Sequence, residues 1–309
     1  MPDFVIRTSN LCLQFERKHV LSMLTLNITS GGVHAIVGAR GAGMSALCRV
    51  LLGFAAPTSG SARVLGCDST RLTPDVRGRI GFIDNAHALP VWMRVDQLLA
   101  MQRSQYERWD QQRFDSVARQ FNVRPEHTIG RMELADRAGL NLALALAQGP
   151  ELLILDAPTS SLPPTAASAF LEALTYANHE AHTTIVYCSH MMDQIERVAD
   201  NLVILERGRV RHMSAPATFC RLVQLWVADF PQREPDLSVL PGVLEIHHVD
   251  GFVHLLVYNQ NKDFGTRLRL LGASSVHAMQ VSLDRAVNGF LSGAPSVHPP
   301  AHAGVAAAS

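Results

Sequence analysis

The feature that most constrains the fold is a glycine-rich loop between a short apolar run and a helical pattern. The apolar run covers residues 33–37, and glycines follow at Gly38, Gly41 and Gly43. Apolar residues then recur at helical spacing over residues 44–54. Strand, glycine loop and helix in this order are typical of a phosphate-binding loop, because N–H groups at a helix N-terminus bind anions. The sequence therefore predicts an α/β domain built around an anion-binding loop.

This loop departs from the usual pattern at its charged position. The pattern G-x-x-x-x-G-K-[S/T] requires a lysine and then a hydroxyl residue after the second glycine. Met44 occupies the lysine position here, and Ser45 follows it. The loss of one electrostatic donor to a reacting phosphate typically costs on the order of 10²–10³ in rate. We therefore expect the backbone of the loop to retain phosphate contacts and the chemistry of hydrolysis to suffer.

Later segments extend the same α/β pattern. Residues 152–156, 183–189 and 201–210 are apolar strand candidates separated by helical segments, which predicts a largely parallel sheet. Residues 95–127 are polar and helical in pattern, and residues 215–230 form an amphipathic segment that we expect to close this domain.

A second, smaller unit is expected after a link rich in proline and acidic residues. Residues 243–258 predict a hairpin that turns at Asp250 and Gly251, and a helix, a strand and a last helix capped by Ser282 follow. We therefore assign residues 1–230 to the first domain and 231–291 to a small α+β domain. The tail, residues 292–309, is low in complexity, and we expect it to be disordered.

Composition excludes several classes of protein. Lys+Arg and Asp+Glu both number 27, so global charge does not favour nucleic acid as a partner. The chain contains no run of about 18 apolar residues that would predict a membrane span, and no signal-peptide pattern at the N-terminus. The five cysteines are far apart and odd in number, which indicates a reduced cytoplasmic protein. Any membrane role is therefore expected to come through a partner.

Further motifs resemble those of a known family. Residues 50–66 follow the loop as a helix, a turn and a strand, residues 151–164 read ELLILDAPTSSLPP, and residues 183–190 read TTIVYCSH. In order and spacing these segments resemble the ATP-binding subunits of ABC transporters, particularly those that drive ABC-2 type exporters. The resemblance covers about residues 5–230, and the C-terminal unit is similar to the accessory domain of that group. It implies a P-loop NTPase domain of the ABC type, with an N-terminal antiparallel β subdomain and a helical subdomain.

The resemblance also implies a site for ATP and Mg²⁺. It assigns Phe15 to adenine stacking, Ser45 and Asp156 to the metal, and His190 to a catalytic switch. Ordinary structural roles are the alternatives: Phe15 in the core, Ser45 as a helix cap and Asp156 in a turn at a strand end. The residues expected to contact nucleotide are Phe15, Gly38, Ala39, Arg40, Gly41, Ala42, Gly43, Met44, Ser45, Ala46 and Asn85.

Several positions depart from the family pattern in addition to Met44. Ala157 stands where the family has a carboxylate that orients the attacking water. Glu133 and Ala135 lie in the segment that replaces the signature L-S-G-G-Q, and Pro163 occupies the D-loop aspartate position. Asn85 is one methylene shorter than the glutamine expected there. These departures affect one transition state, and together they argue against hydrolysis by this chain paired with itself.

Three other features have ordinary explanations that we favour. Arg40 could replace the missing lysine, but its position normally points away from the β- and γ-phosphates. His247, His248 and His254 could suggest a metal site, but adjacent strand residues face opposite sides. Residues 102–114 mix arginine with aromatic residues, as single-strand binders do, yet their spacing also fits a solvated helix face.

The sequence thus leads to one main hypothesis and an alternative of a different class. The main hypothesis is a degenerate ABC subunit that binds nucleotide weakly, hydrolyses it little or not at all, and pairs with an active ATP-binding subunit. Both would lie beneath an ABC-2 type permease on the inner face of the cell membrane. The alternative is a non-enzymatic scaffold that keeps the fold without nucleotide. A soluble ABC protein acting on DNA or ribosomes is disfavoured by the lack of tandem domains, coiled-coil insertions and basic charge.

Overall fold

The computed structural model describes residues 4–16, 18–181, 183–232, 234–261 and 263–293. The chain divides into two compact units, Met1–Val210 (unit 1) and Arg211–Ser309 (unit 2). Each unit is described by itself in the paragraphs that follow.

A six-stranded sheet forms the centre of unit 1. Neighbouring strands follow the order β10-β9-β3-β8-β7-β6, and the pairs from β9 to β6 are parallel. All residues of β3 and β8 are buried, as expected for strands covered on both faces. The carboxyl ends of the parallel strands lie at one edge, which places the loops that follow them together. The strands are β3 (Val33–Val37), β6 (Ile80–Asp84), β7 (Leu152–Asp156), β8 (Thr184–Cys188), β9 (Asn201–Glu206) and β10 (Arg209–Ser214), and the last of these continues into unit 2 from Arg211.

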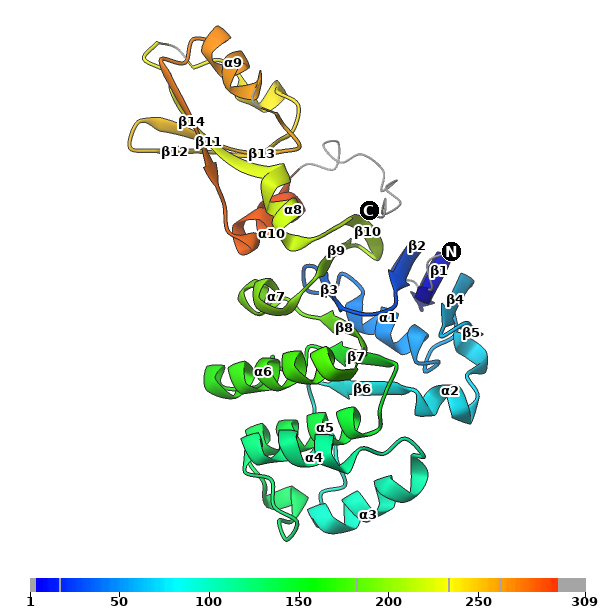
Figure 1. Ribbon diagram of the computed structural model, residues 1–309. Coiled ribbons are helices and arrows are strands. Elements are labelled where there is room, and N and C mark those ends of the chain that lie inside the picture. Colours follow the sequence, from blue (N-terminus) through cyan, green and yellow to red (C-terminus); the bar gives the residue numbers. More distant parts are fainter. Residues whose placement is uncertain (1–3, 17, 182, 233, 262, 294–309) are drawn as a thin grey trace. The chain divides into compact units, whose positions relative to one another are not determined.

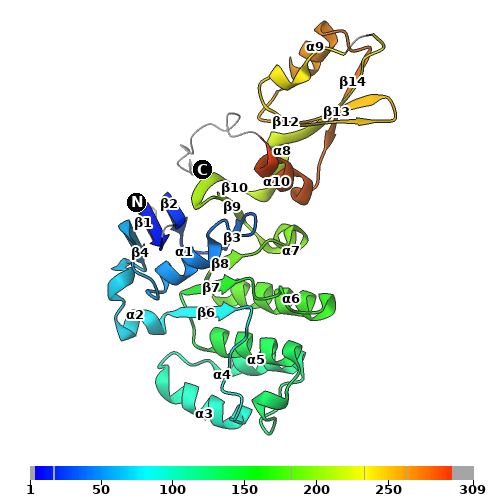
Figure 2. The ribbon, with the colours of Figure 1, turned by 180° about the vertical axis from the view of Figure 1, so that it is seen from behind.

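Helices connect these strands and extend unit 1 past β6. Both ribbon views place α3 and α4 beyond α5 and β6, which confirms the helical region expected over residues 95–127 (Figures 1 and 2). The α-helices are α1 (Met44–Leu51), α2 (Pro74–Gly78), α3 (Val95–Gln105), α4 (Gln111–Ala118), α5 (Leu134–Ala147), α6 (Pro164–Ala181) and α7 (Met192–Val198). Short 3-10 turns cover η1 (Ser69–Arg71), η2 (Arg119–Phe121) and η3 (Ile129–Arg131).

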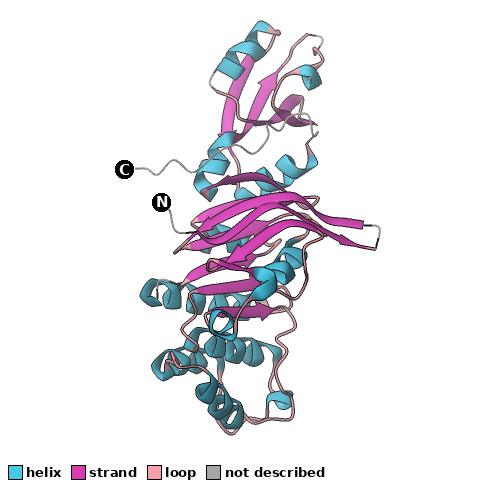
Figure 3. Ribbon diagram, turned by 90° about the vertical axis from the view of Figure 1, so that its right-hand side faces the viewer, coloured by secondary structure: helices cyan, strands magenta, loops and turns pink. Residues whose placement is uncertain are grey.

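An antiparallel sheet of order β2-β1-β4-β5 completes unit 1. Its strands are β1 (Phe4–Phe15), β2 (Lys18–Thr29), β4 (Ser59–Val64) and β5 (Cys67–Asp68). From Leu24 to Ile28 buried apolar residues alternate with exposed ones along β2, which is the period of a half-buried strand. Figure 3 shows β1 and β2 as a long pair of strands. This sheet is the N-terminal β subdomain that the family resemblance implies.

The expected strand over residues 201–210 is two strands joined by a tight turn. Arg207 and Gly208 both have positive φ, at 48° and 74°, and they connect β9 to β10. A Cβ at Gly208 would lie 2.4 Å from the carbonyl oxygen of Val20, so the close approach of β2 requires glycine. An apolar run alone does not reveal such a turn, which is why the segment resembled one strand.

Unit 2 is a four-stranded antiparallel sheet with helices. Its strand order is β12-β13-β11-β14, with β11 (Val223–Asp229), β12 (Val243–Val249), β13 (Phe252–Tyr258) and β14 (Ser275–Gln280). The helices are α8 (Pro216–Leu222), η4 (Leu237–Val239), α9 (Asp263–Leu270) and α10 (Leu283–Ser292). The turn at Asp250 and Gly251 and the cap at Ser282 are confirmed, because both turn residues have positive φ and Ser282 accepts from Arg285 N–H.

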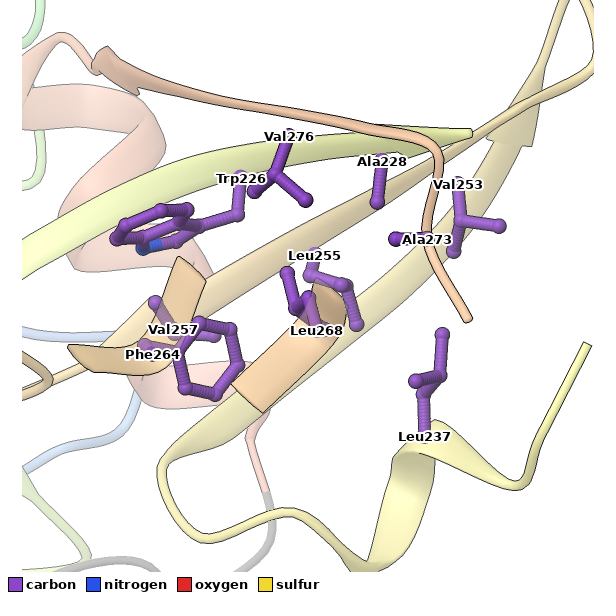
Figure 4. Close-up of a cluster of buried hydrophobic side chains, with 10 residues drawn as sticks. All are labelled: Trp226, Ala228, Leu237, Val253, Leu255, Val257, Phe264, Leu268, Ala273 and Val276. Atoms are coloured by element: carbon purple, nitrogen blue, oxygen red, sulfur yellow. The ribbon is translucent and has the colours of Figure 1, made fainter. Parts of the chain in front are cut away.

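The expected boundary after residue 230 was placed too late. Strand β11 pairs with both β13 and β14, so residues 223–229 form an inner strand of unit 2 rather than the end of unit 1. Trp226 and Ala228 lie in the core of unit 2, where the Trp226 and Phe264 rings are 5.5 Å apart (Figure 4). An amphipathic segment shows that one face is buried but does not show against which sheet. The expected disordered tail begins within α10 at Ser292, and its residues 294–309 lie outside the described part.

Candidate nucleotide site

The loop after β3 is shaped by three glycines with different requirements. Gly41 and Gly43 have φ of 82° and 108°, in the left-handed region that favours glycine. A Cβ at Gly38 would lie 2.3 Å from the carbonyl oxygen of Leu205, and one at Gly43 would lie 2.8 Å from that of Val20. Contact with neighbouring backbone therefore determines the path of the loop.

The loop ends at the N-terminus of α1, where backbone donors are unused by the helix. The first intrahelical bond runs from Leu47 N–H to Gly43 O at 2.9 Å, so the N–H groups of Met44, Ser45 and Ala46 precede it. Gly43 is the N-cap and has no side chain to bond them. Such donors, together with the helix dipole, favour an anion.

Ser45 and Asp156 meet at this end of the sheet. The Ser45 hydroxyl donates to Asp156 Oδ1 at 3.1 Å, which joins the start of α1 to the end of β7. Ser45 is exposed and is the second residue of α1, so it is not the helix cap. The structure thus brings together the two residues expected at the metal, although they are 111 positions apart in the sequence.

Asp84 is a third oxygen-bearing side chain that sequence reasoning missed. It ends β6 and is the register partner of Asp156 on β7, so the two carboxylates project from the same face of the parallel pair. Burial raises the pKa of Asp156, and the Asp84 charge raises it further, while the Ser45 hydrogen bond opposes both. One signal was available, because Asp84 follows the apolar run IGFI as Asp156 follows LLIL.

The loop after β7 is held by side chains. His87 is 1% exposed, and its Nε2–H donates to the Pro158 carbonyl at 2.7 Å. Burial lowers the pKa of His87, and the bond to Pro158 opposes this shift. His87 lies two residues after Asn85, so its hydrogen bond to Pro158 joins the segment after β6 to the loop after β7. Ala157, at the position of the missing carboxylate, has a φ of 51°.

A buried polar network anchors the same loop from its other side. The hydroxyls of Thr159 and Tyr187 both donate to Gln194 Oε1, at 2.6 and 2.8 Å. Burial raises the pKa of Tyr187 to about 12, so the phenol stays protonated. The network joins the loop to β8 and to α7, which begins two residues after His190.

The remaining expected site residues lie at element ends. Phe15 ends β1 and is 49% exposed, which excludes the core role. His190 is exposed after β8, and Asn85 is exposed after β6. Among the described residues, no hydrogen bond or ion pair connects these three to Ser45 or Asp156. Their roles therefore remain predictions.

The positions that depart from the family pattern are exposed or half-buried. Glu133 is exposed and is the N-cap residue of α5, and Pro163 is exposed just before α6. Arg40 is exposed in the loop, while Met44 is half-buried. The cation implied by the family resemblance fits the site, because Mg²⁺ prefers oxygen ligands such as those of Ser45 and Asp156. Phosphates fit the backbone of the loop, but Met44 offers them no charge.

Two histidines of unit 2 contact carboxylates on the surface. His247 Nε2 lies 3.2 Å from Glu245, and His248 Nε2 lies 2.8 Å from Glu234. Within the described ranges, no three His, Cys, Asp or Glu side chains form a group that could hold a metal ion. Across those same residues, the helices are too short or too polar to span a bilayer.

Comparison with known proteins places this geometry in context. Residues 21–160 match the family described as ABC transporter. The chain is 30% identical over 223 residues to methionine import ATP-binding protein MetN 1 of Acinetobacter baylyi, covering 68% of this chain and 62% of that protein. It is 27% identical over 216 residues to bacitracin transport ATP-binding protein BcrA of Enterococcus faecalis, covering 67% and 68%.

The chain thus spans less than two thirds of the methionine import protein. Among solved structures, the ATP-binding subunit of an ABC transporter superposes with a TM-score of 0.62 at 21% identity, covering 70% of this chain and 92% of that one. This superposition shows the fold, and it confirms the fold class expected from the sequence.

Proposed function

Because the chain carries an ATP-binding domain of the ABC transporter family, we propose that it is a degenerate ATP-binding subunit that binds nucleotide with little or no hydrolysis. The observation that carries the proposal is the 3.1 Å contact between Ser45 and Asp156 beside a loop that lacks its lysine. Ser45 and Asp156 supply oxygen ligands suited to a cation, and the loop backbone suits phosphate oxygens. The lysine and the carboxylate that would stabilise the transition state are replaced by Met44 and Ala157.

Binding is supported by the backbone of the loop. Gly43 has no side chain that could cap the N–H groups at the start of α1, and Gly38 and Gly43 allow the loop to lie against neighbouring backbone. These contributions do not depend on the lysine. A bound Mg²⁺ would supply positive charge between phosphate oxygens, and Ser45 and Asp156 would hold it.

Slow hydrolysis is supported by three replacements on different segments of the chain. Met44 cannot neutralise charge that develops on a transferring phosphoryl group, and Ala157 cannot orient a water molecule. Glu133 adds a carboxylate at the N-terminus of α5, where a partner's phosphate would be repelled. We expect these losses to be non-additive, because they affect the same transition state.

The partners follow from the same proposal. A second, active ATP-binding subunit would supply turnover, and an ABC-2 type permease would hold both at the inner face of the cell membrane. An exporter is supported by the 28% identity to the Nod factor export ATP-binding protein I of Neorhizobium galegae, and the methionine import protein shows that importers are also similar. The second subunit would be a copy of this chain or a different chain, and in either pairing Glu133 would lie opposite the phosphate bound by the partner.

The test combines equilibrium binding with turnover on the purified full chain. We expect Mg-ATP to bind with micromolar to millimolar affinity and phosphate release to stay at the level of a no-protein control. The double variant Met44→Lys/Ala157→Glu is the matched gain-of-function control for the assay. ATP hydrolysis by the native chain at the rate of an ordinary ABC subunit would contradict the proposal.

The scaffold alternative is favoured by one specific observation. The loop is held by contacts of Gly38, Gly43 and Gly208 with neighbouring backbone, none of which involves a charged group. The fold can therefore persist without nucleotide. A lack of ATP binding at millimolar concentration, with the chain folded, would decide for the scaffold.

A further inference from the structure

The charges around the loop are unbalanced. Asp84 and Asp156 end adjacent strands in register, and Ser45 contacts the second of them. Met44, at the start of α1, brings no charge to this end of the sheet, and Arg40 is exposed in the loop. Two neighbouring carboxylates repel each other, and a divalent ion would relieve their repulsion.

We infer that a divalent cation, held with the help of Asp84, replaces the missing lysine as the positive charge opposite the phosphates, so that nucleotide binds this chain only together with the cation. The inference rests on the proposed nucleotide-binding function and assigns Asp84 to the same site. It differs from the assignment by family resemblance, which gives only Ser45 and Asp156 to the metal.

Asp84 is suited to this role by its place in the sheet. Its Oδ1 accepts from Ala86 N–H at 3.1 Å, which holds the carboxylate at the end of β6. Because parallel strands in register direct partner side chains to one face, Asp84 lies on the side where Ser45 reaches Asp156. Two carboxylates and a hydroxyl are hard oxygen donors, the class that Mg²⁺, Mn²⁺ and Ca²⁺ prefer.

The protein ligands alone make an incomplete site. Over the described residues, no three carboxylate, histidine or cysteine side chains converge on one point. Phosphate oxygens or water must therefore complete the coordination, as is usual for Mg²⁺. By reciprocity, the cation then strengthens nucleotide binding by the same factor as nucleotide strengthens cation binding. In a site with a lysine this coupling is weaker, because the lysine supplies positive charge to the phosphates whether or not the cation is bound.

The experiment measures this coupling in the full chain. ATP affinity is determined with excess Mg²⁺ and with excess EDTA, and Mn²⁺ is titrated without nucleotide by electron paramagnetic resonance. We expect ATP to bind at least about 100-fold more tightly with Mg²⁺ than with EDTA. In Asp84→Asn, an isosteric change, we expect this ratio to fall about tenfold and Mn²⁺ binding to weaken. Asp75→Asn removes an exposed carboxylate on α2 and should leave both values unchanged.

A second variant tests the same coupling from the opposite side. Met44→Lys supplies a fixed charge, so ATP should bind in EDTA and the Mg²⁺-to-EDTA ratio should fall. Equal affinity of the native chain for ATP in Mg²⁺ and EDTA would overturn the inference and leave the proposed function standing. An Asp84→Asn variant that is folded and keeps the native ratio would also overturn it. Failure of ATP to bind in either condition would overturn the proposed function instead, and the Mn²⁺ titration would still decide whether the carboxylate pair holds a cation.

Discussion

Two loops at the carboxyl edge of the same sheet are held by different means. The loop of residues 38–43, after β3, owes its shape to glycines pressed against backbone oxygens of Val20 and Leu205. The loop of residues 157–163, after β7, is held by buried polar side chains, His87 and Gln194, that bond to it. The first depends on the absence of side chains and the second on their presence. The loop of residues 38–43 can therefore keep its shape although Met44 replaces the lysine that follows it in the usual pattern.

The largest expected effect comes from adding one methyl group to the first loop. Gly38→Ala would place Cβ 2.3 Å from Leu205 O, and backbone cannot move away cheaply, so we expect a loss of about 3 kcal/mol or more in unfolding free energy. Gly41→Ala is the control, because its Cβ meets nothing within 4 Å and only its φ of 82° is unfavourable, at about 1 kcal/mol. Urea denaturation measures both. Equal losses would show that crowding does not hold this loop.

The second effect comes from breaking the buried network of the other loop. Gln194→Leu removes the acceptor shared by Thr159 and Tyr187, and we expect a loss of about 2 kcal/mol from buried hydroxyls left with fewer partners. Tyr187→Phe should cost less, about 1 kcal/mol, because the bond between Thr159 and Gln194 remains. Thermal melts of both variants provide the comparison. A larger loss in Tyr187→Phe would contradict the assignment of Gln194 as the common acceptor.

A smaller effect should appear as a dependence on pH. The pKa of His87 is lowered by burial, so below the ordinary value near 6.5 the unfolded chain binds a proton that the folded chain does not. Stability is therefore unaffected by His87 above that value and falls as the pH decreases below it. His87→Gln keeps a donor for Pro158 but does not titrate. The difference in unfolding free energy between pH 7.5 and 5.5 should be smaller in this variant, and an unchanged difference would exclude His87 as a cause.

The smallest effect is a gain in stability. Ala157 has a φ of 51°, which costs a non-glycine residue on the order of 1 kcal/mol. Ala157→Gly should relieve this strain, less the entropy that glycine adds to the unfolded chain, for a net gain of about 0.5 kcal/mol. Differential scanning calorimetry can detect the shift. A loss of stability would mean that the methyl group of Ala157 makes packing contacts that outweigh the strain.

Much of the fold was predictable because it depends on local patterns. The apolar run of β3, the glycines after it and the spacing of α1 identified the loop, and Asp250 with Gly251 identified the hairpin of unit 2. The turn at Arg207 and Gly208 and the true start of unit 2 were missed, because an apolar segment does not specify the sheet that it joins. Asp84 was missed for a related reason, since its significance depends on its neighbour across the sheet.

The sequence by itself determined the strand, loop and helix at Gly38–Ser45 and the absence of a lysine among them, because these are properties of consecutive residues. Only the tertiary structure decided that Asp84 and Asp156 stand side by side near Ser45. The register of β6 against β7 sets that arrangement, and register depends on how buried faces pack across the whole sheet. The charge of the site is consequently a property of the fold, whereas the shape of the loop is a property of its glycines.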